Sequence, residues 1–189
     1  MYKIPDNISD TDAAPLMCTG ATVWNALHRY GLSSTSTVGV IVIGGLGHPA
    51  IQLAAKLGMK VIILPGSPNK EAEALRLGAS KFALPKNHER PDIGESKLDA
   101  LLISTSVETD WDNYLPLFNP RAAIVPLTVH FGDLRIPQLH VLLAGLRIQG
   151  TVMASRSEMR QMLEFAARHD IRPIAVEFPL SKEGFEDSI

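Results

Sequence analysis

The chain has 189 residues, of which 46% are hydrophobic, and a formal net charge of −2 at pH 7. This is enough apolar material for one sizeable globular core, which argues against a disordered chain. The 18 basic and 20 acidic residues are scattered, so no run of like charge predicts a nucleic-acid or anionic-membrane partner, and small molecules are the expected ligands.

The hydrophobic pattern predicts alternating helices and strands. Apolar residues at helical spacing between Ala13 and Leu27 predict a first helical segment that closes near Gly31. The predicted strands that follow are Val38–Ile43, Lys60–Leu64, Lys81–Leu84, Leu98–Ser104, Arg121–Leu127, Leu146–Ala154 and Ile174–Phe178. The predicted helices are Leu46–Leu57, Asn69–Leu77, Glu108–Leu117, Pro137–Ala144 and Glu158–Arg168. This alternation predicts an α/β fold with a doubly wound parallel sheet of the Rossmann type.

A glycine cluster lies where the first strand gives way to a helix, in the segment Val42-Ile43-Gly44-Gly45-Leu46-Gly47. Glycines let the backbone turn tightly and approach a pyrophosphate, whose charge is met by free N–H groups and the positive helix end. Turns are also rich in glycine, so the cluster alone is weak evidence. With its strand and helix, it predicts a dinucleotide site in which Gly44, Gly45, Leu46 and Gly47 bind the cofactor.

The register of this fingerprint has two readings. Either Gly45-Leu46-Gly47 is followed by Ala50, or Val42 stands where the first fingerprint glycine should be. We favour the second reading, on the resemblance described below. In that case the branched side chain of Val42 crowds the turn, so that the loop shifts or the cofactor is held less tightly.

The residues after the second strand indicate which dinucleotide is bound. An NAD-binding unit places an acidic residue there to hold the ribose hydroxyls, whereas this chain reads Leu64-Pro65-Gly66-Ser67-Pro68-Asn69-Lys70. Ser67, Asn69 and Lys70 can donate hydrogen bonds and positive charge to a 2′-phosphate, which predicts NADP(H). In the alternative reading, Asn69 and Lys70 are only a solvated cap and first turn of the next helix.

Two other nucleotide-binding classes fit less well. A short-chain dehydrogenase needs a Lys four positions after a Tyr, and none of Tyr2, Tyr30 and Tyr114 has one. A methyltransferase usually has an acidic residue after the second strand, which is absent here. For location, the single Cys18 suits a reducing compartment, and neither a signal peptide nor an apolar run of roughly 18 residues is present. We expect a cytoplasmic protein with no membrane partner.

The segments Ala13–Trp24, Gly44–His48 and Ile51–Ala54 resemble the cinnamyl-alcohol-dehydrogenase-like branch of zinc-type medium-chain alcohol dehydrogenases. The resemblance runs over nearly the whole chain. It implies a hinge segment from the catalytic domain at 1–31, a dinucleotide-binding Rossmann domain at 32–155 and a truncated return toward the catalytic domain at 156–189. Roughly the first 140 residues of such an enzyme would be missing, so a fragment is expected.

Individual site residues carry over from this resemblance. Cys18 matches a ligand of the catalytic zinc, which in such enzymes polarises the substrate oxygen. The other zinc ligands have no match, so the chain is not expected to hold zinc itself, and no catalytic residue is assigned. Six histidines, His28, His48, His88, His130, His140 and His169, are expected on the surface or in loops. The resemblance also places Thr22, Thr105, Leu127, Thr128, Met153 and Ser155 near the cofactor.

The implied reaction transfers a hydride between NADPH and an aldehyde or primary alcohol, and the chain alone is expected to be inactive. The strand Leu146–Ala154 resembles the edge through which such dehydrogenases pair into homodimers. Two alternatives stay open. One is a zinc-free quinone or enoyl reductase, against which Cys18 argues, and the other is a non-catalytic NADP(H)-binding module.

Overall fold

The computed structural model describes residues 3–85 and 89–181. Six parallel strands form one sheet in the order β3-β2-β1-β4-β5-β6. Their bounds are Thr37–Ile41 (β1), Lys60–Leu64 (β2), Lys81–Phe82 (β3), Leu98–Ile103 (β4), Phe118–Pro126 (β5) and Arg147–Ile148 (β6). Because β1 pairs with both β2 and β4, the strand order reverses between β1 and β4, as the doubly wound prediction requires.

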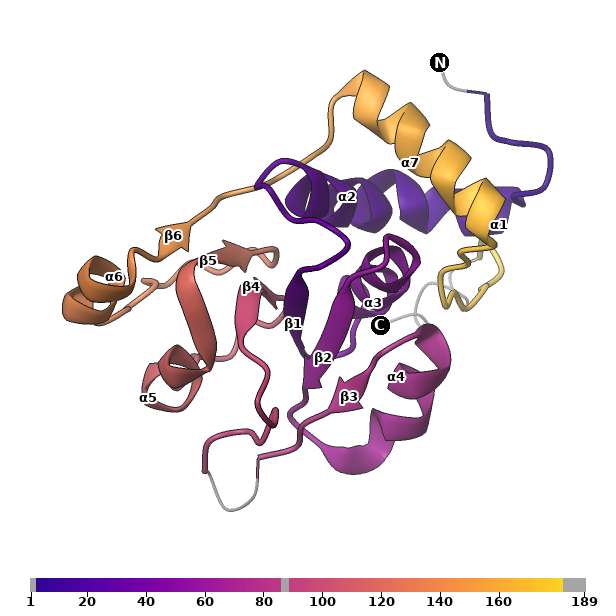
Figure 1. Cartoon of the computed structure of the whole chain (residues 1–189). Helices are drawn as coiled ribbons and strands as arrows, with labels where there is room; N and C mark the ends of the chain where they lie inside the picture. Colours follow the sequence, from indigo (N-terminus) through magenta and orange to yellow (C-terminus); the bar gives the residue numbers. More distant parts are fainter. Residues whose placement is uncertain (1–2, 86–88, 182–189) are drawn as a thin grey trace.

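Helices cover both faces of this sheet (Figure 1). Their bounds are Asp10–Pro15 (α1), Ala21–His28 (α2), Gly47–Lys56 (α3), Glu71–Leu77 (α4), Trp111–Tyr114 (α5), Gln138–Ala144 (α6) and Arg156–His169 (α7). Successive strand residues point to opposite faces: Val40 joins the core under α2, α3 and α7, while Ile41 joins a second core under α5. No helix within the described ranges is long and apolar enough to cross a membrane.

Helices α2 and α7 pack side by side on the face of the sheet that α3 also covers. The helical segment predicted from Ala13 begins at Asp10 and contains a π-helical turn, Leu16–Gly20 (η1), before α2. α7 begins at a capping box, in which the Ser155 hydroxyl accepts from the Glu158 N–H and the Glu158 carboxylate accepts from the Ser155 N–H. α2 lies against α7 (Figure 1), so residues from both ends of the chain share the core beside α3.

The structure corrects several predicted element bounds. β1 ends at Ile41 rather than Ile43, because Val42 leaves the extended conformation with φ at +69°. The helix predicted from Glu108 begins only at Trp111 and continues as a 3₁₀ turn, Leu115–Leu117 (η3), which contains Pro116. A second 3₁₀ turn, Pro68–Lys70 (η2), precedes α4.

The predicted edge strand Leu146–Ala154 is mostly wrong, since the strand beside β5 is Arg147–Ile148, followed by one more bond from the Gln149 N–H to the Ile124 carbonyl at 2.9 Å. Side chains of α2 and of the residues just after it donate hydrogen bonds to the backbone carbonyls beyond β6, which in a longer strand would be free to pair with another strand. Tyr30 donates to Gly150, Thr22 to Val152 and Asn25 to Met153. These bonds hold residues 150–153 against α2 instead of in the sheet.

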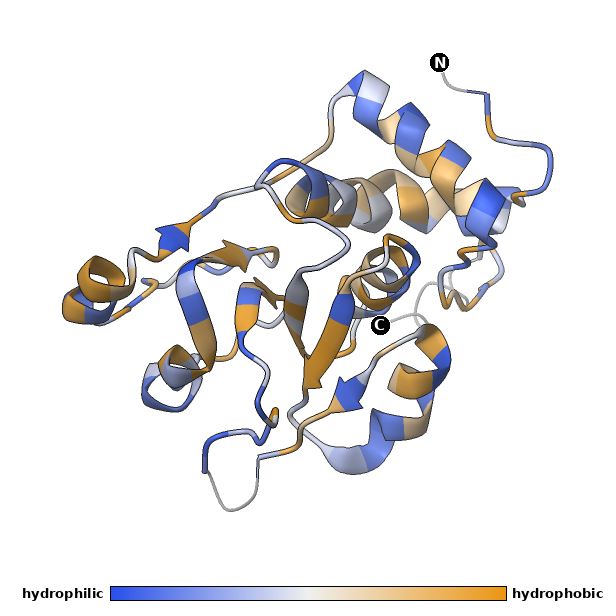
Figure 2. Cartoon of the chain, in the orientation of Figure 1, coloured by the Kyte–Doolittle hydropathy of each residue, from blue (hydrophilic) through white to orange (hydrophobic). Residues whose placement is uncertain are grey.

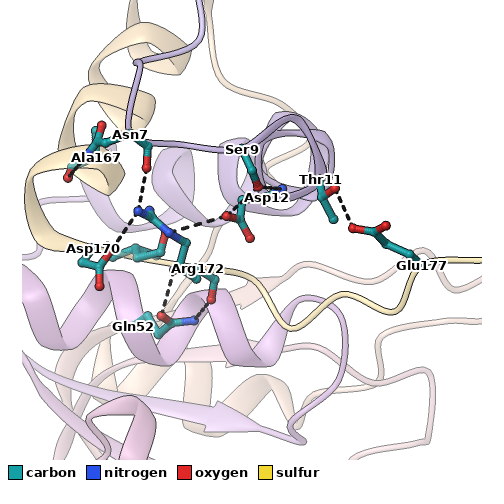
Figure 3. A network of polar contacts seen from close by, with 10 residues as sticks. Asn7, Ser9, Thr11, Asp12, Gln52, Ala167, Asp170, Arg172 and Glu177 are labelled. Atoms are coloured by element: carbon teal, nitrogen blue, oxygen red, sulfur yellow. Dashed lines mark hydrogen bonds and ion pairs between the residues drawn. The ribbon is translucent and has the colours of Figure 1, made fainter.

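The predicted last strand, Ile174–Phe178, is also wrong, because this segment has no strand conformation and side chains hold the residues just before and within it. Gln52 of α3 donates to the Arg172 carbonyl at 2.8 Å and accepts from its N–H at 3.3 Å. The Arg172 guanidinium lies 2.8 Å from Asp170 and 3.5 Å from Asp12, and it donates to the Asn7 carbonyl (Figure 3). These contacts tie residues 170–174 to α1 and α3.

An apolar helix marks the β6 end of the sheet. α6 is coloured mostly hydrophobic in Figure 2, yet none of its residues is buried. Leu142 and Leu143 are 73% and 77% exposed, and Val152 and Met153 beyond β6 are exposed as well. This end of the molecule therefore carries an uncovered apolar surface.

Candidate functional site

The turn between β1 and α3 is fixed by one backbone contact. A Cβ added to Gly47 would lie 2.2 Å from the Val42 carbonyl oxygen, so only glycine lets α3 begin this close to the end of β1. Val42 itself has φ +69°, a left-handed conformation that costs a branched residue about 1–2 kcal/mol. The glycine fingerprint register with Val42 in the first glycine position agrees with this geometry.

Gly44 and Gly45, which lie between Val42 and Gly47, leave their backbone accessible. A Cβ on Gly44 or Gly45 would meet no atom within 4 Å, so an incoming group can approach the main chain here. No side chain caps the N-terminus of α3, and Pro49 in its first turn has no N–H to satisfy. The His48 N–H donates to the Gly44 carbonyl at 3.1 Å, so the exposed backbone at Gly44 and Gly45 and the positive end of the ten-residue helix are what an anion can approach here.

His48 is buried, so its prediction as a surface or loop histidine was wrong. The Ile174 N–H donates to its Nε2 at 3.0 Å, which leaves Nδ1 to carry the proton and donate to the Gly44 carbonyl at 2.9 Å. Burial lowers the pKa of His48 by more than the Gly44 hydrogen bond and the nearby Glu73 raise it. The neutral imidazole thus holds the glycine turn to the segment after α7.

The other histidines follow the prediction more closely. His28, His130 and His140 are exposed and His169 is half-buried, while His88 lies outside the described residues. His48 was detectable in principle, since it stands four residues before Gln52 on a helix that is otherwise apolar up to Lys56. Both side chains reach the same segment, residues 172–174.

A cavity of about 800 Å³ opens at the carboxyl ends of β1, β2 and β4, next to the strand-order reversal. Val42, Leu64 and Gly66 line one side, and Thr105 and Tyr114 line the side toward α5. Among the described residues, the charged side chains that line it are Glu89, Glu108 and Asp110. Nucleotides bind at this position in doubly wound sheets, and the volume suits the adenosine part of a dinucleotide.

The residues predicted to meet a 2′-phosphate lie just outside this cavity. Ser67, Asn69 and Lys70 are exposed, beginning three residues after the end of β2. The Lys70 ammonium donates to the Ile43 carbonyl at 2.8 Å, which holds this cation against the glycine turn. Within residues 3–85 and 89–181 this is the bond that its ammonium makes, which leaves two of its three N–H donors for another acceptor.

A second cavity, of about 400 Å³, lies at the ends of β4 and β5. Thr105 lines both cavities and Thr128 lines this one, together with His130 and Arg135. Leu127 is buried, and its N–H donates to the Ile103 carbonyl at 2.9 Å. These three predicted residues therefore continue the same sheet edge beyond the first cavity.

The remaining predicted residues lie together on the far side of α2. The buried hydroxyl of Thr22 is 2.7 Å from the Val152 carbonyl, and Ser155 caps α7 as described above. Met153 is exposed, and its carbonyl accepts from Asn25 at 2.7 Å. Sequence reasoning missed Asn25 and Tyr30, which position this segment, because nothing in their spacing distinguishes them from ordinary helix residues.

The sequence profile of the family described as "Zinc-binding dehydrogenase" matches residues 45–168, more than half of the chain. The chain belongs to the zinc-binding dehydrogenase family. The matched residues begin inside the glycine turn and run through the sheet into α7, so they contain most of the site described above. The resemblance noted in the sequence is thereby confirmed.

Relatives of known name agree with this family. The chain is 32% identical over 173 residues to a probable mannitol dehydrogenase from Fragaria ananassa, covering 90% of this chain and 48% of that protein. It is 33% identical to NADP-dependent alcohol dehydrogenase C 1 from Mycolicibacterium smegmatis, covering 92% of this chain and 50% of that protein. The chain thus spans about half the length of the curated relatives it matches.

A solved structure supports the fold in more detail. The cinnamyl alcohol dehydrogenase SbCAD4 from Sorghum bicolor superimposes with a TM-score of 0.86 at 28% identity, over 99% of this chain and 53% of that one. The Rossmann-like sheet with helices on both faces is therefore the fold of a dehydrogenase cofactor domain, as predicted.

The described residues of this chain do not form a zinc site by themselves. Cys18, the predicted zinc ligand, is an exposed thiol on the π-helical turn before α2. Across residues 3–85 and 89–181, no three His, Cys, Asp or Glu side chains gather as a metal site would require. A dinucleotide does fit, because the open glycine turn, the uncapped helix end and the cavity adjoin one another.

Proposed function

We propose that this chain is the NADP(H)-binding portion of an alcohol dehydrogenase or aldehyde reductase. The observation that carries the proposal is the glycine turn at Gly44–Gly47, where the backbone is open beside a cavity at the sheet's switch point. The pyrophosphate would bind to the amides at the start of α3, and the adenosine would enter the cavity of about 800 Å³. Thr105, Leu127 and Thr128 extend that path toward the nicotinamide end.

NADP(H) is favoured over NAD(H) by the charge after β2. Ser67, Asn69 and Lys70 are exposed polar residues that follow the carboxyl end of β2, and none of them is acidic. The relative from Mycolicibacterium smegmatis is named as NADP-dependent, which supports the same assignment. Lys70 is the main determinant in this proposal, because its ammonium stands beside the glycine turn.

In the complete enzyme, the bound cofactor would exchange a hydride with an aldehyde or primary alcohol. The segments 1–31 and 156–189 would lead from and back to the catalytic domain, and their packing as α2 against α7 supports this division. Cys18 is then one ligand of a zinc that further residues complete. Because the described residues hold no such set, we expect the chain by itself to reduce no aldehyde.

We further propose a cytoplasmic homodimer formed at the β6 end of the sheet. Among the described strands, β6 has a neighbour on one side only, and the exposed leucines of α6 directly precede it in the chain. A second copy of this edge would cover both features at once. Sedimentation velocity tests this: a dimer is expected, and a monomer at all concentrations would contradict it.

A titration of the purified chain with NADPH and NADH tests the cofactor assignment. NADPH should bind more tightly, and Lys70→Ala should weaken NADPH binding by a few-fold to about tenfold while sparing NADH. Lys56→Ala, at the other end of α3, is the matched control and should change neither affinity. Equal or stronger binding of NADH would overturn the assignment of NADP(H).

A further inference from the structure

We propose that Val42 restrains how tightly this chain binds its dinucleotide, by keeping a branched side chain at the inner end of the nucleotide cavity. The inference rests on the proposed function and adds a residue that sets affinity within the same site. It predicts an unusual outcome, namely that removing a side chain from the site strengthens binding.

The backbone of Val42 is held on several sides. Its N–H points to the Leu64 carbonyl of β2 at 3.4 Å, and its carbonyl is 2.9 Å from the Ser104 hydroxyl. The same carbonyl faces Gly47 so closely that a Cβ there would lie 2.2 Å away. With φ at +69° and both polar groups engaged, the residue has little freedom to turn its side chain elsewhere.

The side chain itself points to the nucleotide side of the sheet. Val42 is half-buried, packs against the core under α5 and lines the cavity with Leu64 and Gly66. The other large residues of the turn, Ile43 and Leu46, pack into the core under α3 on the opposite face. Within the turn, Val42 alone places a branched side chain toward the cavity.

A dinucleotide that reaches from the cavity to the amides of α3 must pass over this position. Glycine at residue 42 would tolerate the left-handed backbone and remove the bulk, so the phosphates could approach more closely. Ser67 and Lys70, which would distinguish NADPH from NADH, are not among the residues that line the cavity. The gain should therefore be the same for both cofactors.

The test is a titration of the 189-residue chain with NADPH and NADH, comparing wild type with Val42→Gly. We expect Val42→Gly to lower the Kd for both cofactors by about tenfold. Val42→Ala keeps a Cβ at positive φ and should give a smaller gain. Val176→Gly removes an exposed valine far along the chain from the turn and should leave both affinities unchanged.

Circular dichroism of each variant shows whether it folds, and Val42→Ala remains informative if Val42→Gly does not. An unchanged or weaker affinity in a folded Val42→Gly protein overturns the role of Val42, while NADPH binding by wild type would leave the proposed function intact. Binding by Val42→Gly alone supports the inference. If neither protein binds either cofactor, the proposed function and the inference both fail.

Discussion

The region around α3 and the region around α6 are both built from an apolar helix beside parallel strands, but they differ in how the helix is covered. In α3, Ala50, Ile51, Leu53 and Ala54 are fully buried by β1, β2 and the helices around them. In α6 no residue is buried, and its leucines face outward. The helix beside the glycine turn is thus covered within the chain, whereas the helix beside β6 leaves its apolar side chains exposed.

Backbone polar groups are satisfied in both regions, but by different means. At α3, the Gly44 carbonyl and the Ile174 N–H are both satisfied by His48 inside the protein. At the β6 side, the strand stops after two residues and the following carbonyls are taken up by α2. Three pairs of like residues, one from each region, can test this comparison.

The largest difference is expected for leucines. Leu53→Ala, at a fully buried position of α3, should lower the free energy of unfolding by about 2–5 kcal/mol, because it removes buried area and leaves a cavity. Leu143→Ala on α6 should change it by less than about 0.5 kcal/mol. Urea denaturation measures both, and a cost at Leu143 that grows with protein concentration would reveal a dimer that this residue stabilises.

Much of this architecture was readable from the sequence. The buried strands, the glycine turn and α3 follow from continuous apolar runs, glycine punctuation and a change of period, all of which are local signals. The failures lie where distant side chains decide the backbone path. Residues 149–154 are drawn to Thr22, Asn25 and Tyr30, and residues 172–174 bond to Gln52 and His48. Such long-range pairings leave no periodic trace in the sequence.

The candidate site was predictable in the same uneven way. Gly44–Gly47 and the residues after β2 were located correctly relative to the strands, because strand ends fix them. The left-handed backbone of Val42 was foreseen only as crowding, and the burial of His48 was not foreseen. Both depend on what packs against the turn from other elements.

The second pair of like residues is Gly47, at the start of α3, and Gly150, after β6. Gly47→Ala should destabilise the fold by about 1–3 kcal/mol, since its Cβ would clash with the Val42 carbonyl and force the turn open. It should also weaken NADPH binding, because the start of α3 would shift. Gly150→Ala is the control, as its Cβ would meet no atom within 4 Å. A Gly47→Ala protein as stable as wild type would show that the turn is looser than its contacts indicate.

The smallest effect concerns histidines and pH. Since burial lowers the pKa of His48, the unfolded chain binds a proton more readily than the folded one. The stability that His48 contributes is therefore complete above the ordinary histidine pKa of about 6.5 and is lost as pH falls below it.

His48→Gln should cost about 1 kcal/mol at pH 8, through its two buried hydrogen bonds, and progressively less as the solution is acidified. Unfolding curves from pH 8 to pH 5 measure this, with His140→Gln on α6 as the exposed control that should follow the wild-type profile. If the difference between wild type and His48→Gln stayed constant across this range, the imidazole would not be held neutral by its burial, and the contrast between the two helices would rest on packing alone.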